Sequence, residues 1–333
     1  MELLRTIPTP EKLKADIAVP LACREQIKQS REILIDTLTN KTNKMLLLVG
    51  PCSADNEDAV VEYASRLAKL QQEVEEKFLI VPRVFTAKPR RQSNAYKGLV
   101  HQPQIDSQEN MAQGIIAARK LHVAVAYKTG LLTADEMLYP DIVQYTDDVV
   151  SYWVVGARSV ENQQHKLVAS GMVQPVGMKN PMNGDLRSLM SAVDFTKQPH
   201  HFILSGNEYV SEGNALTHAI LRGYVDNNGT AHSNYDMQTL GWLAENNQTI
   251  IVDCNHHNSG KNYLLQPKIA KEVLKSISND KSLQKSVRGL MLESYLSEGK
   301  RRVGEEGFGK SLTDACLGWQ QTEELIKELA AII

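Results

Sequence analysis

The chain has 333 residues, 42% of them hydrophobic and 23% charged, so it can bury a large core. Its formal net charge of -2 provides no global attraction for nucleic acid or an anionic membrane. The first residues lack the apolar core of a signal peptide, and no run approaches the roughly 20 apolar residues that span a bilayer. We therefore expect a cytoplasmic protein that binds neither nucleic acid nor membrane.

Residues 11–40 are charged and have apolar positions at a loose helical spacing, which predicts an N-terminal helical arm. We place this arm at residues 1–42, ahead of a catalytic core of residues 43–333. The arm is interpreted either as a simple packing helix or as a regulatory or oligomerisation element. The four cysteines lie far apart in a long chain, so no disulfide framework is needed.

Beyond the arm, short apolar runs alternate with turns and helix-compatible stretches, the rhythm of a parallel sheet covered by helices. The core strands are predicted at Leu46–Val49, Leu79–Val84, Val123–Tyr127, Trp153–Val155, Val173–Gly177, Ala219–Leu221, Ile250–Asp253 and Gly289–Leu292. A further run, His201–Leu204, is assigned to a small peripheral β-hairpin. Eight such units in one chain favour an α/β (β/α)8 TIM barrel over an open doubly wound sheet.

Charged and metal-competent side chains follow nearly every predicted strand. Along the chain they are Cys52, Arg83, Lys88, Arg158, Lys179, Arg222, His256, Glu293 and Asp314. In a parallel barrel the carboxyl ends of all strands meet on one face, so these residues are expected to converge in one pocket. Any single one of them, taken alone, would more often be a solvated loop residue.

Two groups of side chains are distinguished within this set. Cys52, His256, Glu293 and Asp314 offer a thiolate, an imidazole and two carboxylates, which suit a first-row divalent ion. His257 competes with its neighbour as the imidazole ligand, and Cys52 alone would more often be a buried small hydrophobe. The second group is cationic and would surround a small, multiply charged anion such as phosphoenolpyruvate, unless its members pair with acidic residues of nearby loops.

Longer segments carry a family resemblance from about Met45 to the C-terminus. They read GPCSADNEDAV, YKGLVHQP, GMKNPMNGDL, NHHNSGKNY, GLMLESYLSEG and GKSLTDACLGW. The chain thus resembles the type I 3-deoxy-D-arabino-heptulosonate 7-phosphate (DAHP) synthase family. Synthases of eight- or nine-carbon sugar acids share the barrel and phosphoenolpyruvate, but the segment KPR is more similar to the DAHP branch.

The resemblance implies a metal-dependent transferase that condenses phosphoenolpyruvate with D-erythrose 4-phosphate and water to give DAHP and phosphate. This reaction is the first step of the shikimate pathway of aromatic amino-acid biosynthesis. The resemblance implies that a divalent metal (Mn, Fe, Co or Zn) is bound by Cys52, His256, Glu293 and Asp314. Phosphoenolpyruvate would be held by Arg83, Lys88, Arg158, Lys179 and Arg222.

The remaining expected roles concern the aldose and proton transfer. Arg90 would bind the phosphate of erythrose 4-phosphate. Lys88, Cys52 and His256 are the expected catalytic residues, with Lys88 as the proton donor to the nascent alkoxide. Neighbouring arginines are expected to lower the pKa of Lys88 toward the working pH.

The sequence departs from the family pattern at two positions. Arg91 replaces the usual threonine after KPR, so we expect it to contact the aldose phosphate or to change the aldose preference. Many relatives also carry a glutamate, thought to position the attacking water, at the end of the third strand. Here the alignment puts Lys128, in AYKTGLL, at that place, where a cation would oppose catalysis unless it points away.

Relatives bind an aromatic amino-acid effector near a subunit contact. The equivalent stretch of this chain includes Leu138–Pro140, Val168, Val173, Phe202 and Leu204. Val173 and Leu204 stand where some relatives have small polar residues. By analogy we expect a homodimer or homotetramer. Two alternatives remain open, a phosphoenolpyruvate-dependent synthase for another aldose and a non-catalytic anion-binding protein.

Overall fold

The computed structural model describes residues 1–90, 92, 94–105 and 107–333. Its core is an eight-stranded parallel sheet with the order β2-β1-β12-β11-β8-β5-β4-β3, and a bridge between Arg83 and Ala134 joins its two ends. The strands are β1 (Met45–Gly50), β2 (Phe78–Pro82), β3 (Thr133–Glu136), β4 (Val150–Val155), β5 (Val176–Lys179), β8 (His218–Leu221), β11 (Ile250–Asp253) and β12 (Val287–Glu293). This arrangement confirms the predicted TIM barrel.

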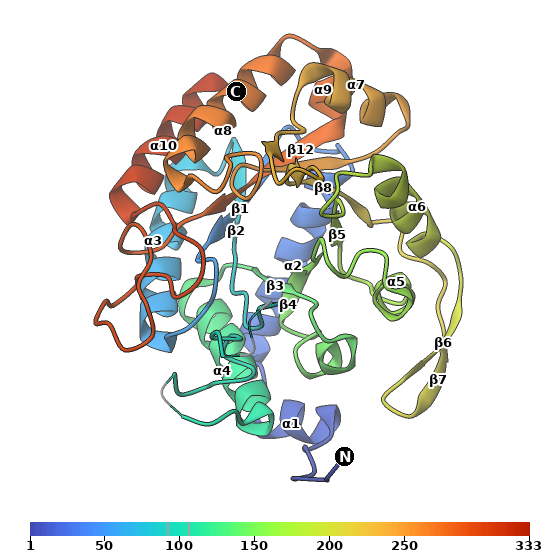
Figure 1. The fold of residues 1–333 in the computed structure, drawn as a ribbon, viewed down its shortest axis with the longest axis vertical. Helices are drawn as coiled ribbons and strands as arrows, with labels where there is room; N and C mark the ends of the chain where they lie inside the picture. Colours follow the sequence, from blue (N-terminus) through green and yellow to red (C-terminus); the bar gives the residue numbers. More distant parts are fainter. Residues whose placement is uncertain (91, 93, 106) are drawn as a thin grey trace.

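Helices surround the ring of strands (Figure 1). They are α3 (Glu57–Val74), α4 (Met111–Thr129), α5 (Gln163–Ser170), α6 (Leu186–Thr196), α7 (Met237–Glu245), α8 (Gln266–Ser278), α9 (Lys281–Ser286) and α10 (Trp319–Ile332), with short 3-10 turns η1 (Pro140–Tyr145) and η2 (Tyr263–Leu265). Because helices cover the outside and side chains fill the inside, the strands are buried on both faces; every residue of β1 and β12 is buried.

The predicted third strand, Val123–Tyr127, is wrong, since these residues lie inside helix α4. The side chain of Asn110 caps the helix by accepting a hydrogen bond from the backbone of Gln113, and Gly130 ends it at a φ of 71°. The true third strand, β3, begins four residues after the helix and reads TADE. Two acidic residues in this strand hide it from a search for apolar runs.

The predicted fifth strand also begins too early. Val173 is 78% exposed, and strand β5 starts only at Val176. The other six predicted core runs overlap strands of the barrel.

Helices α1 (Pro10–Asp16) and α2 (Leu21–Leu38) precede the barrel, and α2 lies across the middle of the ring in Figure 1. Arg31 on α2 donates hydrogen bonds to the backbone oxygens of Asp147 and Val150, where β4 begins. Arg288, near the start of β12, donates to the backbone oxygen of Thr37 at the end of α2. Helix α2 therefore covers the amino-terminal end of the barrel. The division of the chain at residues 42 and 43 stays a prediction.

Two hairpins extend from the barrel. The predicted peripheral hairpin pairs β6 (His201–Leu204) with β7 (Asn207–Val210) and projects to one side in Figure 1. A shorter one pairs β9 (Tyr224–Val225) with β10 (Ala231–His232). Within the described ranges, no helix combines the length and apolar character needed to cross a membrane.

Candidate active site

Ionisable side chains from the carboxyl ends of the strands gather at one cavity of about 330 Å³. Because the strands are parallel, these ends share one face of the barrel, as the sequence predicted. The predicted residues that line the cavity are Cys52, Lys88, Arg90, Arg158, Lys179, Arg222, His256 and Asp314. Arg83 and Glu293 are fully buried beside them. Arg91 lies outside the described residues.

Three of the four predicted metal ligands come together, and the fourth lies beside them. One ligand atom from each of Cys52, Glu293 and Asp314 lies within 4.8 Å of the other two. His256 lies beside this group of three, with its Nε2 3.9 Å from Oε1 of Glu293. The backbone of His256 has a φ of 47°, in the left-handed region that residues with a side chain rarely adopt.

Asp253, the last residue of β11, lies beside His256. Its Oδ2 lies 2.8 Å from Nδ1 of His256 and 3.1 Å from Nζ of Lys179. Burial acts to raise the pKa of Asp253, but the charges of these two neighbours hold it well below its ordinary value. A carboxylate beside Nδ1 favours a proton on that nitrogen and leaves Nε2 free to act as a ligand. Asp253 was not predicted as a site residue, although it ends the predicted strand Ile250–Asp253, two residues before the segment NHHNSGKNY.

The protonation of the cluster fits a divalent cation. Burial, and then the charge of Glu293, raise the pKa of Cys52 to about 11. Burial lowers the pKa of His256, which therefore favours the neutral, metal-binding form. Despite its burial, Glu293 has a pKa of about 2, because His256, Arg83 and Lys88 stabilise its charge. A bound cation would remove the thiol proton of Cys52 and add positive charge to this carboxylate-rich group.

Arg83 is a fully buried residue with free hydrogen-bonding capacity. One nitrogen, Nη2, donates to Oε1 of Glu293 at 2.9 Å. Its Nε and Nη1 are buried and have no hydrogen-bond partner among the described residues. Unpaired buried donors cost free energy, and a guanidinium can donate two parallel hydrogen bonds to a carboxylate or phosphate.

The surroundings of Lys88 differ from the expected ones. Its Nζ lies 3.9 Å from Oε2 of Glu136. Burial acts to lower the pKa of Lys88, but the negative charges of Cys52 and Glu136 outweigh it, so the pKa is raised. The prediction of a lowered pKa is therefore wrong, because it counted neighbouring arginines and no neighbouring acid. With a raised pKa, Lys88 holds its proton at neutral pH.

The two adjacent histidines make different contacts. His256 faces Glu293, whereas Nδ1 of His257 lies 3.0 Å from Nη1 of Arg222. Burial, and then the charge of Arg222, lower the pKa of His257 to about 4. His257 thus lies beside the cation Arg222, whereas His256 lies beside the carboxylate of Glu293.

Glu136 takes the place that the sequence analysis gave to Lys128. Lys128 lies exposed in the last turn of α4, so it is not at a strand end. Glu136 ends the true third strand and lines the cavity. The error follows from the misplaced third strand. With Val123–Tyr127 taken as the strand, Lys128 falls at its end, whereas the last residue of β3 is Glu136.

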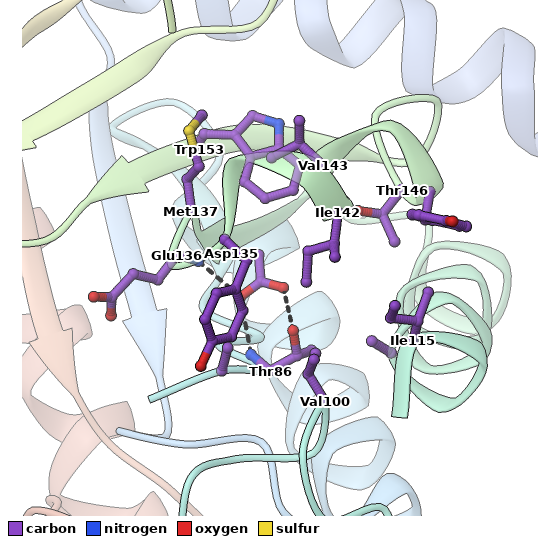
Figure 2. Close-up of a pocket in the computed structure, with 14 residues that line it drawn as sticks. Thr86, Val100, Ile115, Asp135, Glu136, Met137, Ile142, Val143, Thr146 and Trp153 are labelled. Carbon is purple, nitrogen blue, oxygen red and sulfur yellow. Dashed lines mark hydrogen bonds between the residues drawn. The ribbon is translucent and has the colours of Figure 1, made fainter. Parts of the chain in front are cut away.

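A buried hydrogen-bond network fixes the end of β3. The Asp135 carboxylate accepts hydrogen bonds from the backbone and hydroxyl of Thr86, at 2.9 and 2.6 Å, and lies 3.1 Å from Nε2 of His122. Figure 2 shows these two bonds to Thr86 beside a small apolar cavity, with the Glu136 carboxylate pointing away from them. Successive residues of a strand point to opposite faces, so anchoring Asp135 holds Glu136 toward the active-site cavity.

Comparisons with known proteins agree with this geometry. Residues 22–327 match the family described as the DAHP synthetase I family. The chain is 35% identical over 338 residues to the Tyr-sensitive phospho-2-dehydro-3-deoxyheptonate aldolase of Salmonella typhimurium, covering 98% of this chain and 92% of the relative. It is 30% identical to the phenylalanine-inhibited enzyme of Saccharomyces cerevisiae, covering 96% and 90% of the two chains.

A solved structure has the same architecture. The phospho-2-dehydro-3-deoxyheptonate aldolase of Francisella tularensis superimposes with a TM-score of 0.92 at 28% sequence identity. The superposition covers 100% of this chain and 98% of the other. The similarity therefore includes the barrel, its hairpins and the helices before it.

Proposed function

The chain belongs to the DAHP synthetase I family, and we propose that it condenses phosphoenolpyruvate with erythrose 4-phosphate and water to give DAHP and phosphate. This is the first step of aromatic amino-acid biosynthesis through the shikimate pathway. One observation carries the proposal: a Cys, His, Glu and Asp cluster adjoins a cavity walled by arginine and lysine side chains. A dense positive wall beside a metal-competent cluster suits a small substrate with both a phosphate and a carboxylate.

Phosphoenolpyruvate is proposed to bind the cationic wall made by Arg83, Lys88, Arg158, Lys179 and Arg222. The unpaired Nε and Nη1 of Arg83 support this assignment, because a bidentate anion would satisfy both. Arg158 is exposed at the mouth and donates to the backbone oxygen of Pro89 at 3.3 Å. Buried Arg83 and exposed Arg158 would therefore contact the anion at its inner and outer ends.

Erythrose 4-phosphate is proposed to bind through its phosphate to Arg90, which is exposed at the edge of the same cavity. Arg91 is proposed as a second contact or a determinant of aldose preference. Comparing kcat/KM for four- and five-carbon aldose phosphates in the wild type and in Arg91→Thr tests this role. If the kcat/KM ratio for the two aldose phosphates is equal in the two proteins, this role of Arg91 is rejected. A wild-type preference for the five-carbon aldose would favour a phosphoenolpyruvate-dependent synthase for another aldose.

The proposed chemistry forms one carbon–carbon bond. The methylene carbon of phosphoenolpyruvate attacks the aldehyde carbon, and Lys88 donates its proton to the resulting alkoxide. The Glu136 carboxylate holds a water molecule, which adds to the enol carbon and gives one proton to Glu136. The new hydroxyl becomes the ketone as phosphate leaves by carbon–oxygen cleavage with the hydroxyl proton, and the proton on Glu136 passes back to Lys88, 3.9 Å away. The arginines hold the departing phosphate. When bound, a first-row divalent cation supplies Lewis acidity toward the aldehyde oxygen.

Metal dependence is proposed from the same cluster, with Cys52, His256, Glu293 and Asp314 as ligands. We expect treatment with a chelator to abolish turnover and Mn²⁺ to restore it. Independently of activity, Mn²⁺ should raise the thermal unfolding midpoint of the metal-free protein, and Cys52→Ser should weaken that effect. Full turnover in the presence of excess chelator would contradict metal dependence.

The reaction is tested directly by mixing the Mn²⁺-loaded protein with both substrates and following the loss of the ultraviolet enol absorbance of phosphoenolpyruvate. Release of phosphate in equal amount is expected. If phosphoenolpyruvate binds but no aldose phosphate is consumed, the chain is an anion-binding protein and the proposed reaction is rejected.

An aromatic amino-acid effector is also proposed, since relatives are named Tyr-sensitive and phenylalanine-inhibited. A second cavity of about 230 Å³, beside the hairpin, has apolar walls that include Val168, Val173, Phe202 and Leu204. Addition of tyrosine, phenylalanine or tryptophan should lower turnover by one of the three. Activity that is insensitive to all of them would reject the effector.

A homodimer or homotetramer is proposed because the hairpin exposes apolar side chains. Ile203 and Val210 are 68% and 69% exposed. Burial of these side chains against a second copy would remove apolar surface from water. Light scattering that gives the mass of a single chain would exclude this assembly.

A further inference from the structure

His257 is a buried polar side chain that the proposed chemistry does not use. It lines the active-site cavity together with Arg222, Lys261 and Asp314. Its Nδ1 lies 3.0 Å from Nη1 of Arg222. No hydrogen-bond partner of its other ring nitrogen, Nε2, occurs in the part of the chain that the structure describes.

The contact with Arg222 decides which nitrogen of His257 carries the proton. A guanidinium has only donors, so the nitrogen facing it must accept. Nδ1 of His257 is therefore the unprotonated nitrogen, and the proton of the neutral ring is on Nε2. Nε2 becomes a hydrogen-bond donor on the wall of a cavity that Arg158, Lys179 and Arg222 also line.

The ring and the guanidinium are held together by their backbones as well. The backbone nitrogens of His257 and Asn258 both donate to the backbone oxygen of Arg222, at 3.0 and 3.2 Å. Gly223, at a φ of 70°, lets the two segments approach, since a Cβ there would lie 2.5 Å from the carbonyl carbon of His257. The position of the imidazole relative to Arg222 is thus fixed before any ligand arrives.

We propose that His257 is a substrate-binding residue whose Nε2–H donates a hydrogen bond to an anionic oxygen of the ligand that Arg222 binds. The inference rests on the proposed function only for the identity of that ligand. Because the ring accepts a charge-assisted hydrogen bond at Nδ1, it is polarised and becomes a stronger donor at Nε2. The neutral imidazole binds the anion by this hydrogen bond. It therefore adds no further positive charge near the enol carbon, where positive charge develops.

The test compares His257→Phe, which keeps a planar ring without polar atoms, with His257→Gln, whose amide can both accept from Arg222 and donate to a ligand. His201→Phe, at a 76% exposed side chain on the hairpin, is the matched control. Isothermal titration of the Mn²⁺-loaded proteins with phosphoenolpyruvate, inorganic phosphate and pyruvate measures binding without turnover. The last two probes separate a contact with the phosphate from one with the carboxylate.

We expect His257→Phe to raise the Kd for phosphoenolpyruvate about tenfold or more, the usual effect of losing a hydrogen bond to a charged group. His257→Gln should stay within about threefold of the wild type, and the control should be unchanged. The KM for phosphoenolpyruvate should rise in His257→Phe, with little change in the KM for the aldose.

Two results would overturn the inference. One is an unchanged Kd for phosphoenolpyruvate and for both smaller probes in His257→Phe. The other is a loss confined to Mn²⁺ affinity, which would make His257 a metal ligand. If His257→Phe does not fold, His257→Ala against His257→Gln gives the same comparison. A wild type that binds phosphoenolpyruvate without condensing it rejects the proposed reaction but leaves this inference open to the same titrations.

Discussion

At the scale of single residues, the chemistry depends on two opposite charges inside the cavity. Nζ of Lys88 and Oε2 of Glu136 lie 3.9 Å apart, and both side chains are 9% exposed. The negative charge of Glu136 helps to raise the pKa of Lys88, so the lysine remains a proton donor at neutral pH. The same carboxylate is proposed to hold the attacking water.

Replacing Glu136 with Gln should lower kcat about 100-fold or more, the usual effect of losing a positioned acid–base group. The KM for phosphoenolpyruvate should change less, because the cationic wall is intact. Steady-state kinetics beside Glu76→Gln, at an exposed turn before β2, provides the comparison. A kcat equal to that of the control would exclude Glu136 from the reaction.

Replacing Lys88 with Met should also sharply reduce kcat, because the alkoxide loses its proton donor. Mn²⁺ content measured on the same sample should stay at the wild-type level, since Lys88 is not a ligand. Unchanged turnover in Lys88→Met would reject the role of proton donor.

At the scale of elements, helix α2 completes the barrel at the end opposite the active site. Arg288 is 4% exposed and is tied to this region by hydrogen bonds to the backbone oxygens of Thr37 and Thr42 and to Oδ1 of Asn40. Leu34 and Leu38 on α2 belong to the main apolar core. The helix therefore contributes to the core, in addition to preceding it in the chain.

Removal of residues 1–42 should destabilise the barrel strongly. It exposes the core that α2 covers to water and removes the acceptors of Arg288 at Thr37, Asn40 and Thr42, at about 1.5–3 kcal/mol for each hydrogen bond to a charged group. Denaturant unfolding of residues 43–333, compared with a chain lacking only the exposed residues 1–7, measures this loss. Equal midpoints for the two proteins would mean that residues 1–42 are a dispensable arm.

At the scale of the whole molecule, stability depends on buried groups that titrate. His218, on β8, is 2% exposed; its Nδ1 lies 2.8 Å from the backbone oxygen of Leu216, and its Nε2 lies 2.6 Å from the hydroxyl of Tyr152. Burial lowers its pKa to about 4. The neutral ring can donate from Nδ1 to Leu216 and accept at Nε2 from the hydroxyl of Tyr152. A protonated ring would lose the acceptor at Nε2 and place a positive charge in the core.

The pH dependence follows from this lowered pKa. Between pH 6.5 and pH 4 the unfolded chain binds a proton at His218 that the folded chain does not, so stability falls as the pH falls. From pH 7.5 to pH 5 this residue should account for a loss of about 2 kcal/mol. Urea unfolding at the two pH values should show a smaller loss for His218→Gln than for the wild type. Identical losses would contradict the role of His218.

The sequence by itself determined the barrel and the gathering of ionisable side chains at one of its ends. Long apolar runs such as MLLLVG, buried on both faces, predict parallel strands from local composition alone. The polar residues after them, Cys52, Arg83, Lys179 and Glu293, could be assigned to one pocket because parallel strands end on one face.

Only the tertiary structure decided the third strand and the contacts that tune the site. Strand β3 carries acids because Thr86 and His122, far away in the sequence, supply partners for Asp135. His256 and His257 are adjacent in the sequence, yet His256 contacts Glu293 and His257 contacts Arg222. Such assignments depend on groups brought together by folding, and local composition carries no information about those partners.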